Sequence, residues 1–165
     1  MKKITLILLL ALSWQAYSQI PERNIVAKHE MKIDMAYLLS PAFKLEYENL
    51  LNEGNSWGIV GFANIANNPT FAYQLLGFYR LYFGKSFASG FFLEGNFGVT
   101  GGHRYGSWSQ SDDYAAAGAG IALGWKLVTE KGVVLDLFAG LGRLFENNFD
   151  PGVYPRMGIC LGKRF

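Results

Sequence analysis

Hydrophobic and polar positions alternate along most of this chain, in segments of about ten residues, which is the length of a tilted strand that crosses a membrane. Successive side chains of a β-strand point to opposite faces, so a period of two predicts strands with one apolar and one polar face. Turn-forming residues separate the segments. The sequence predicts eight strands, at residues 30–39, 42–50, 56–65, 71–83, 90–100, 114–128, 132–144 and 154–165.

The odd-numbered positions of these strands form an apolar row that is almost free of charge, whereas the even-numbered positions collect charged and polar residues and many glycines. The third strand is the weak case, because Val60 and Phe62 lie on its even side. A membrane barrel is apolar outside and polar inside, and a soluble lipocalin-like barrel reverses this arrangement. The pattern predicts an all-β fold, namely an eight-stranded antiparallel up-and-down transmembrane β-barrel.

Aromatic residues of the odd row gather near the strand ends, which suggests the two aromatic girdles of a membrane barrel. The girdle expected on the periplasmic side contains Tyr47, Trp57, Phe83, Phe91, Trp125 and Phe165. The girdle expected on the outer side contains Tyr37, Phe43, Phe71, Tyr73 and Phe97.

The connections differ in length, and this difference orients the predicted barrel. Short connections at 51–55, 84–88 and 129–131 belong to one end, together with both chain termini, and we expect this end to face the periplasm. The longer connections, 101–113 and 145–153, belong to the other end, where outer-membrane barrels carry their longer loops.

Residues 1–18 have the organisation of a secretory signal peptide, with two lysines, an apolar run and small residues before an expected cleavage at Gln19. We expect residues 19–165 to form the outer-membrane barrel domain. Removing the two lysines takes the formal net charge from +2 to zero, so no nucleic-acid partner is expected. The single Cys160 cannot form an internal disulfide.

Several segments from Glu30 to Phe165 resemble small outer-membrane β-barrels catalogued as a domain of unknown function, within the group of eight-stranded OmpA-like barrels. The resemblance implies a fold and an outer-membrane location, and it brings no catalytic residues. It depends on Leu45-Glu46-Tyr47-Glu48, Arg80-Leu81-Tyr82-Phe83-Gly84-Lys85, Gly90-Phe91-Phe92-Leu93-Glu94-Gly95, Gly124-Trp125-Lys126, and Pro155-Arg156-Met157-Gly158 with Arg164-Phe165.

Charged side chains on the even row are the main candidate for chemistry. An eight-stranded barrel is just wide enough for side chains to fill it, so opposite charges inside should meet as a structural plug. The alternative is a narrow channel with Arg80, Glu94, Asp136 and Arg156 as its constriction. The expected lumen charges are Lys32, Lys44, Arg80, Lys126, Arg156 and Arg164 against Asp34, Glu46, Glu48, Glu94 and Asp136.

The 101–113 connection is the second candidate. Its His103, serines such as Ser107, and aspartates are the residue types of a hydrolase triad, so a lipid-modifying hydrolase is a further alternative. A flexible loop gives a triad no rigid support, however, and a surface role is favoured. In that role the side chains of Arg104, Tyr105 and Trp108 would contact lipopolysaccharide or a partner.

The sequence favours a non-enzymatic outer-membrane barrel with a structural or surface-interaction role, monomeric, without a catalytic or metal site and without a cofactor. Its expected partners are outer-membrane lipid, lipopolysaccharide and the barrel-assembly machinery, which would recognise the C-terminal strand. His29 and His103 belong to opposite ends of the predicted barrel, which weakens the case for a metal site. Cys160 is expected to fill space in the lumen.

Overall fold

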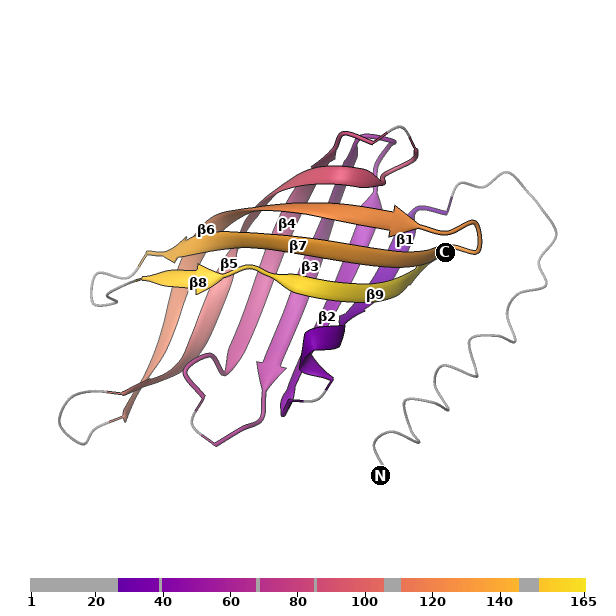
Figure 1. Cartoon of the computed structure of the whole chain (residues 1–165). Helices are drawn as coiled ribbons and strands as arrows, with labels where there is room; N and C mark the ends of the chain where they lie inside the picture. Colours follow the sequence, from indigo (N-terminus) through magenta and orange to yellow (C-terminus); the bar gives the residue numbers. More distant parts are fainter. Residues whose placement is uncertain (1–26, 39, 68, 85, 106–110, 146–151) are drawn as a thin grey trace, which may run out of the picture.

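A computed structural model describes residues 27–38, 40–67, 69–84, 86–105, 111–145 and 152–165. Antiparallel pairing links the strands in chain order, and the last strand pairs with both β7 and β1, which closes the sheet. Because β8 and β9 form one interrupted strand of the wall, the fold is a closed eight-stranded barrel (Figure 1). The strands are β1 (His29–Asp34), β2 (Ala42–Leu50), β3 (Asn55–Asn64), β4 (Tyr73–Tyr82), β5 (Gly90–Tyr105), β6 (Ser111–Val128), β7 (Val133–Leu144), β8 (Val153–Pro155) and β9 (Gly158–Arg164).

One short 3-10 helix, η2 (Met35–Tyr37), follows β1. In the part of the chain that is described, no helix is long and apolar enough to cross a membrane. We call the end of the barrel with the 51–54, 83–89 and 129–132 connections the short-turn end, and the opposite end the long-loop end.

The predicted closure of the last strand onto the first is confirmed by the register of β1 and β9. Glu30 pairs with Arg164, Lys32 with Gly162 and Asp34 with Cys160. On its other edge, β9 pairs with β7. The first and last strands therefore meet at a seam of five residue pairs, as few as between β1 and β2.

Burial alternates along the strands as the two rows predict: even-numbered side chains point into the barrel and odd-numbered ones outward. Phe97 and Ile121 on the odd row are 69% and 68% exposed, whereas Glu48 and Arg80 on the even row have no exposed surface. The third strand, whose alternation was the least clear in the sequence, also has its even-numbered side chains inside, because Val60 is buried in the barrel. The outer wall is thus apolar and the interior is charged.

Aromatic side chains form a contacting row around the short-turn end. His29 stacks on both Tyr47 and Phe165, and Tyr47 meets Trp57 edge-on, with centroids 6.0, 6.1 and 6.5 Å apart. Further round the barrel, Phe83 lies 5.8 Å from Phe91, which is paired in the ladder with Trp125. We call this row the aromatic belt.

The corresponding set at the long-loop end is only partly as predicted. Phe43, Tyr73 and Phe97 are exposed on the outer wall. Tyr37 instead packs against Phe62, with ring centroids 5.2 Å apart, and Phe71 packs against a buried apolar cluster. The prediction that Tyr37 and Phe71 face outward was therefore wrong.

The first strand is shorter than the predicted 30–39. It ends at Asp34, whose side chain accepts a hydrogen bond from Ala36 N at 3.1 Å and so caps η2. Lys44 Nζ donates to the same carboxylate at 2.8 Å and holds it in place. The chain therefore leaves the wall after Asp34, and Met35 and Tyr37 do not continue the outward row; residue 39 lies outside the described residues.

The prediction of a loop at residues 101–113 was also wrong. β5 and β6 continue their ladder to the pair Tyr105↔Ser111, so residues 101–105 and 111–113 are strand. Their glycines, serines and aspartates suggested a loop, but pairing with a neighbouring strand overrides local propensity. Most of the other predicted loop, 145–153, lies outside the described residues, and Val153 begins β8.

The last predicted strand, 154–165, is interrupted at Arg156 and Met157 without a change of register. Pro155 pairs with Leu141 and Gly158 with Phe138, so the same offset holds on both sides of the interruption. Arg156 N still donates to Gly140 O at 3.0 Å. Even-numbered residues consequently remain inward along the whole last strand.

Glycines on the inner face make room for large side chains from the neighbouring strand. Gly142 pairs with Tyr154, and a Cβ at Gly142 would lie 2.0 Å from Tyr154 Cζ. The Tyr154 hydroxyl in turn donates to Asn96 Oδ1 at 2.6 Å. The ring therefore has a fixed place directly over the glycine.

We predict that Gly142→Ala lowers the free energy of unfolding by about 1–3 kcal/mol, because the added methyl displaces the buried Tyr154 ring. Gly61→Ala is the matched control, since nothing lies within 4 Å of a Cβ there. Urea unfolding followed by circular dichroism measures both. Equal stability of the two variants would contradict the packing described here.

Candidate functional site

The interior of the barrel holds a dense set of opposite charges, which we call the lumen network. It includes every charged residue predicted for the lumen, and also Glu30, which has no exposed surface. Glu30 begins the first predicted strand at an even position, so the parity rule could have identified it. Six cations, Lys32, Lys44, Arg80, Lys126, Arg156 and Arg164, face six carboxylates, Glu30, Asp34, Glu46, Glu48, Glu94 and Asp136.

Glu48 on β2 has the most partners in this network. Its Oε2 accepts from Lys32 Nζ, from Arg80 Nη1 at 2.7 Å and from Lys126 Nζ at 2.9 Å. Its Oε1 accepts from the hydroxyls of Ser56 and Tyr82, both at 2.5 Å. One carboxylate thus binds side chains from β1, β3, β4 and β6.

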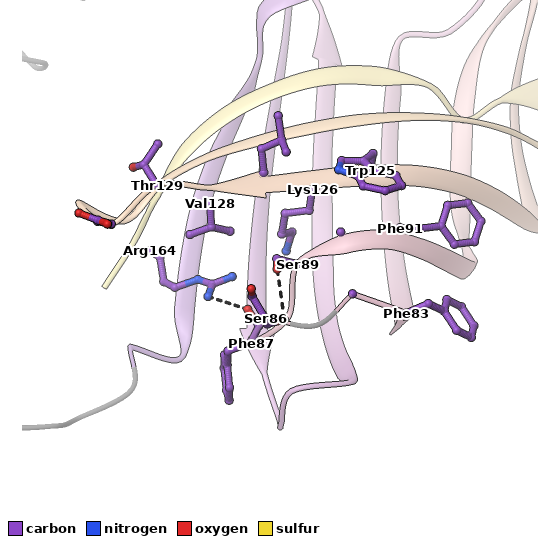
Figure 2. A pocket seen from close by; sticks show the side chains of 14 residues that line it. Phe83, Ser86, Phe87, Ser89, Phe91, Trp125, Lys126, Val128, Thr129 and Arg164 are labelled. Carbon is purple, nitrogen blue, oxygen red and sulfur yellow. Dashed lines mark hydrogen bonds between the residues drawn. The ribbon is translucent and has the colours of Figure 1, made fainter.

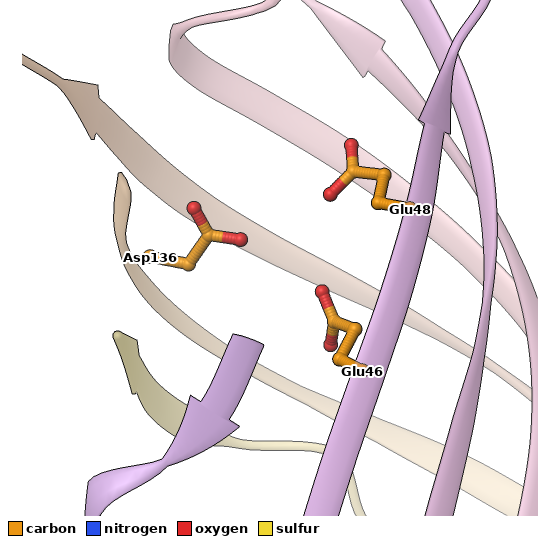
Figure 3. Close-up of side chains that lie close together, drawn as sticks. All are labelled: Glu46, Glu48 and Asp136. Atoms are coloured by element: carbon orange, nitrogen blue, oxygen red, sulfur yellow. The ribbon is translucent and has the colours of Figure 1, made fainter. Parts of the chain in front are cut away.

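Three carboxylates converge in a way that resembles a metal site. Figure 3 shows Glu46 and Glu48 on β2 and Asp136 on β7 pointing toward one another, and one oxygen of each lies within 4.8 Å of the others. Lys32 Nζ contacts all three, at 2.8 Å from Glu46 Oε1 and 2.7 Å from Asp136 Oδ2. The ammonium group therefore takes the position that a metal ion would need.

The four residues considered as a channel constriction are brought together by direct contacts. Glu94 accepts from Arg80 Nε at 2.9 Å and from Arg156 Nε at 2.8 Å. Arg80 Nη1 also donates to Asp136 Oδ2 at 2.8 Å. These contacts span the lumen from β4 and β5 to β7 and the last strand.

Aromatic rings inside the barrel lie against the cations, a feature that charge reasoning missed. Arg80 Cζ lies 4.4 Å from the centroid of Phe78 and 4.5 Å from that of Phe92, and Arg156 Cζ lies 4.4 Å from that of Phe138. Contacts of this kind add electrostatic attraction in a dry site. All three rings are at even positions, so the alternation of the strands could have predicted that they face the lumen.

Two apolar clusters cover the lumen network. Toward the long-loop end, Leu76, Tyr114, Leu144 and Tyr154 belong to one cluster of buried side chains. Toward the short-turn end, a second cluster includes Leu50, Ala88 and Phe92. Most of the charges thus lie between two apolar clusters.

The 83–89 connection folds across the short-turn end. Arg164 donates to the carbonyls of Phe87 and Ala88 at 3.0 and 2.9 Å, and Ala88 N donates to Glu53 O at 2.9 Å. A groove of about 730 Å³ lies between this connection and the end of β6 (Figure 2). The groove has aromatic walls, but its cations, the buried Lys126 and the partly exposed Arg164, are already paired with Glu30.

The residues of the surface-loop hypothesis are not assembled into a site by the described part of the chain. His103 Nδ1 lies 2.6 Å from Asp113 Oδ1, and the Asp113 side chain is 82% exposed. Ser107 and Trp108 lie outside the described residues, and Arg104 and Tyr105 are placed as backbone positions of β5. His29 lies at the opposite end of the barrel, where it contacts the Tyr47 hydroxyl at 2.7 Å.

A scan against protein-family models and searches of curated proteins and of solved structures found no match to this chain.

We predict that Glu48→Gln lowers the free energy of unfolding by about 3–5 kcal/mol, because it removes one charge from a buried network and leaves three cations undercompensated. Glu130→Gln, in an exposed turn, is the matched control and should change stability by less than about 0.5 kcal/mol. Urea unfolding of both variants measures the difference. A Glu48 variant as stable as the control would show that the network contributes little.

Proposed function

We propose that this protein is a non-enzymatic outer-membrane β-barrel with a structural or surface-interaction role, and that its lumen is plugged. The observation that carries the proposal is the inversion of polarity: the outer wall is apolar while the interior is charged. A barrel in water gains nothing from exposing such a wall, whereas a barrel in lipid needs one. The aromatic belt supports the same environment, because amphipathic rings favour the bilayer interface.

The proposed location follows from the same features together with the N-terminal segment. Residues 1–18 would direct export and be cleaved, and the short-turn end would face the periplasm. The C-terminal strand, which ends in Phe165, would be recognised by the barrel-assembly machinery. Outer-membrane lipid and lipopolysaccharide would surround a monomeric barrel related to the small OmpA-like barrels.

A plug is favoured over a channel because the charges inside neutralise one another. The lumen network contains six positive and six negative groups, so its net charge is zero. Arg80 contacts four of the carboxylates at once. A water-filled pore would need these side chains to stay apart. Their mutual contacts support a closed barrel whose exposed parts, rather than its interior, meet the surroundings.

We predict that Ile121→Arg prevents stable insertion, since an arginine near the middle of a lipid-facing wall costs about 2–4 kcal/mol. Ile121 lies on the outer wall between Gly95 and Leu141. The measurement is the amount of protein recovered in the outer-membrane fraction with heat-modifiable electrophoretic mobility.

Thr129→Arg introduces the same side chain in an exposed turn and should leave recovery unchanged. Normal assembly of the Ile121 variant, or recovery of the wild type from a soluble periplasmic pool, would refute the membrane proposal.

A second prediction concerns conduction. Because side chains fill the lumen, the wild-type barrel reconstituted in a planar bilayer should show no single-channel events. Steady unitary currents from the wild-type barrel would support the channel alternative instead.

A further inference from the structure

A small cavity at the long-loop end reaches from the outer wall into the lumen. Its volume is about 120 Å³, and it is bordered by η2, β2, β4 and the interruption between β8 and β9. Pro155 and Met157 are exposed on the outer side, whereas Lys44 and Arg156 are buried on the inner side. The lining residues are Tyr37, Lys44, Phe62, Phe71, Gln74, Tyr154, Pro155, Arg156 and Met157.

The cavity exists because the seam is incomplete at this end. β1 leaves the wall at Asp34, and in the described part of the chain β8 pairs with β7 alone. Side chains replace the missing strand: Lys44 Nζ donates to Met157 O at 2.8 Å, and Ile159 N donates to Asp34 Oδ1 at 3.4 Å. The edge of β8 beyond these contacts borders the cavity.

Hydrogen-bond donors dominate the inner wall of the cavity. Arg156 uses Nε and Nη2 for carboxylates, and its buried Nη1 has no hydrogen-bond partner among the described residues. Because Nε and Nη2 both bind Glu94, Nη1 lies on the opposite edge of the guanidinium. A buried guanidinium nitrogen without an acceptor is costly. Nη1 has almost no accessible surface, so an anion in the cavity would bind it after neighbouring side chains shift.

Lys44 and Gln74 add further donors. Lys44 Nζ carries three protons and binds Asp34 Oδ2 and Met157 O, which leaves one proton uncommitted. Gln74 Nε2 binds Thr100 Oγ1 at 2.9 Å and has a second proton. None of the described lining residues is an aspartate or a glutamate.

We propose that this cavity binds a small oxyanion, a phosphate or carboxylate group, between Lys44, Gln74 and Arg156. Its volume is roughly four times the share of one water molecule in the liquid, which suits a single tetrahedral or planar anionic group. Tyr37 and Phe62 pack against each other beside the cavity, and together with Met157 they provide an apolar surface that suits an attached alkyl chain. The group can therefore belong to a free ion or to the head of an anionic amphiphile.

The proposed site lies beyond the structural role proposed above. Oxyanion binding depends on the folded barrel and on the cavity at the seam, and it requires neither conduction nor contact with a partner protein. A barrel that fails to conduct, or that has no surface partner, would still bind the anion.

The test is isothermal titration calorimetry of the full mature barrel folded in maltoside micelles, with inorganic phosphate as titrant at constant ionic strength. Wild type should show saturable binding, and Gln74→Glu should weaken it at least about tenfold, because it places a carboxylate beside the anion. Asn64→Asp adds the same charge at the same end, outside the cavity lining, and should leave the affinity within about twofold of wild type.

Gln74→Met serves if Gln74→Glu does not fold; it removes the donor without adding charge and should also weaken binding. Titration with a short-chain phosphatidic acid distinguishes the sources: tighter binding than inorganic phosphate identifies an amphiphile, and equal binding identifies the free ion. The proposal would be overturned if wild type gave no saturable heat up to about 20 mM phosphate, a concentration well above a dissociation constant of about 1 mM. Equal affinity of wild type and both Gln74 variants would overturn it as well.

Discussion

Mutual neutralisation of the charges inside the barrel is the constraint on which this structure depends. Removing an ion from water costs several kcal/mol, so each buried charge needs partners with good geometry. Glu48 on β2 finds Lys32 on β1, Arg80 on β4 and Lys126 on β6. β1 is the ladder neighbour of β2, whereas β6 faces β2 across the lumen only when the sheet is closed. Closing the barrel brings the charges of β2 and β6 together, and their pairing offsets the cost of burying them.

The packing around the charges follows from the small diameter of the barrel. Large side chains on one strand lie over glycines on the next, as Tyr154 does over Gly142, and aromatic rings fill the remaining space beside the guanidinium groups. Interleaving rings with charges lowers the effective dielectric around each ion pair, which strengthens attraction between partners and raises the cost of an unpaired group. Because the same packing buries the charged groups, each of them needs a partner.

The sequence predicted the strands, their two faces and the lumen charges because the alternation of side chains can be read from the sequence alone. A shift of one residue in register would move every side chain to the other face, so the alternation also fixes the register. It did not predict the end of β1, since the hydrogen bond from Ala36 to Asp34 and the ion pair with Lys44 are set by tertiary contacts. The prediction of a loop at residues 101–113 was also wrong, because pairing between β5 and β6 overrides the loop-like composition of this segment. The aromatic contacts of Arg80 were not predicted, although Phe78 and Phe92 lie on the same even-numbered row as the charges.

The two places where the strands become irregular lie next to each other in the barrel wall. β1 stops at Asp34, and the last strand is interrupted after Pro155, on facing sides of one seam. Asp34 and Lys44 then take over the roles of a missing strand by binding the backbone at Ile159 and Met157. A continuous ladder would have completed the wall beside Arg156, which is buried in the lumen. The interrupted one leaves its free edge beside a cavity, so the least regular part of the barrel is where a ligand can reach its charged interior.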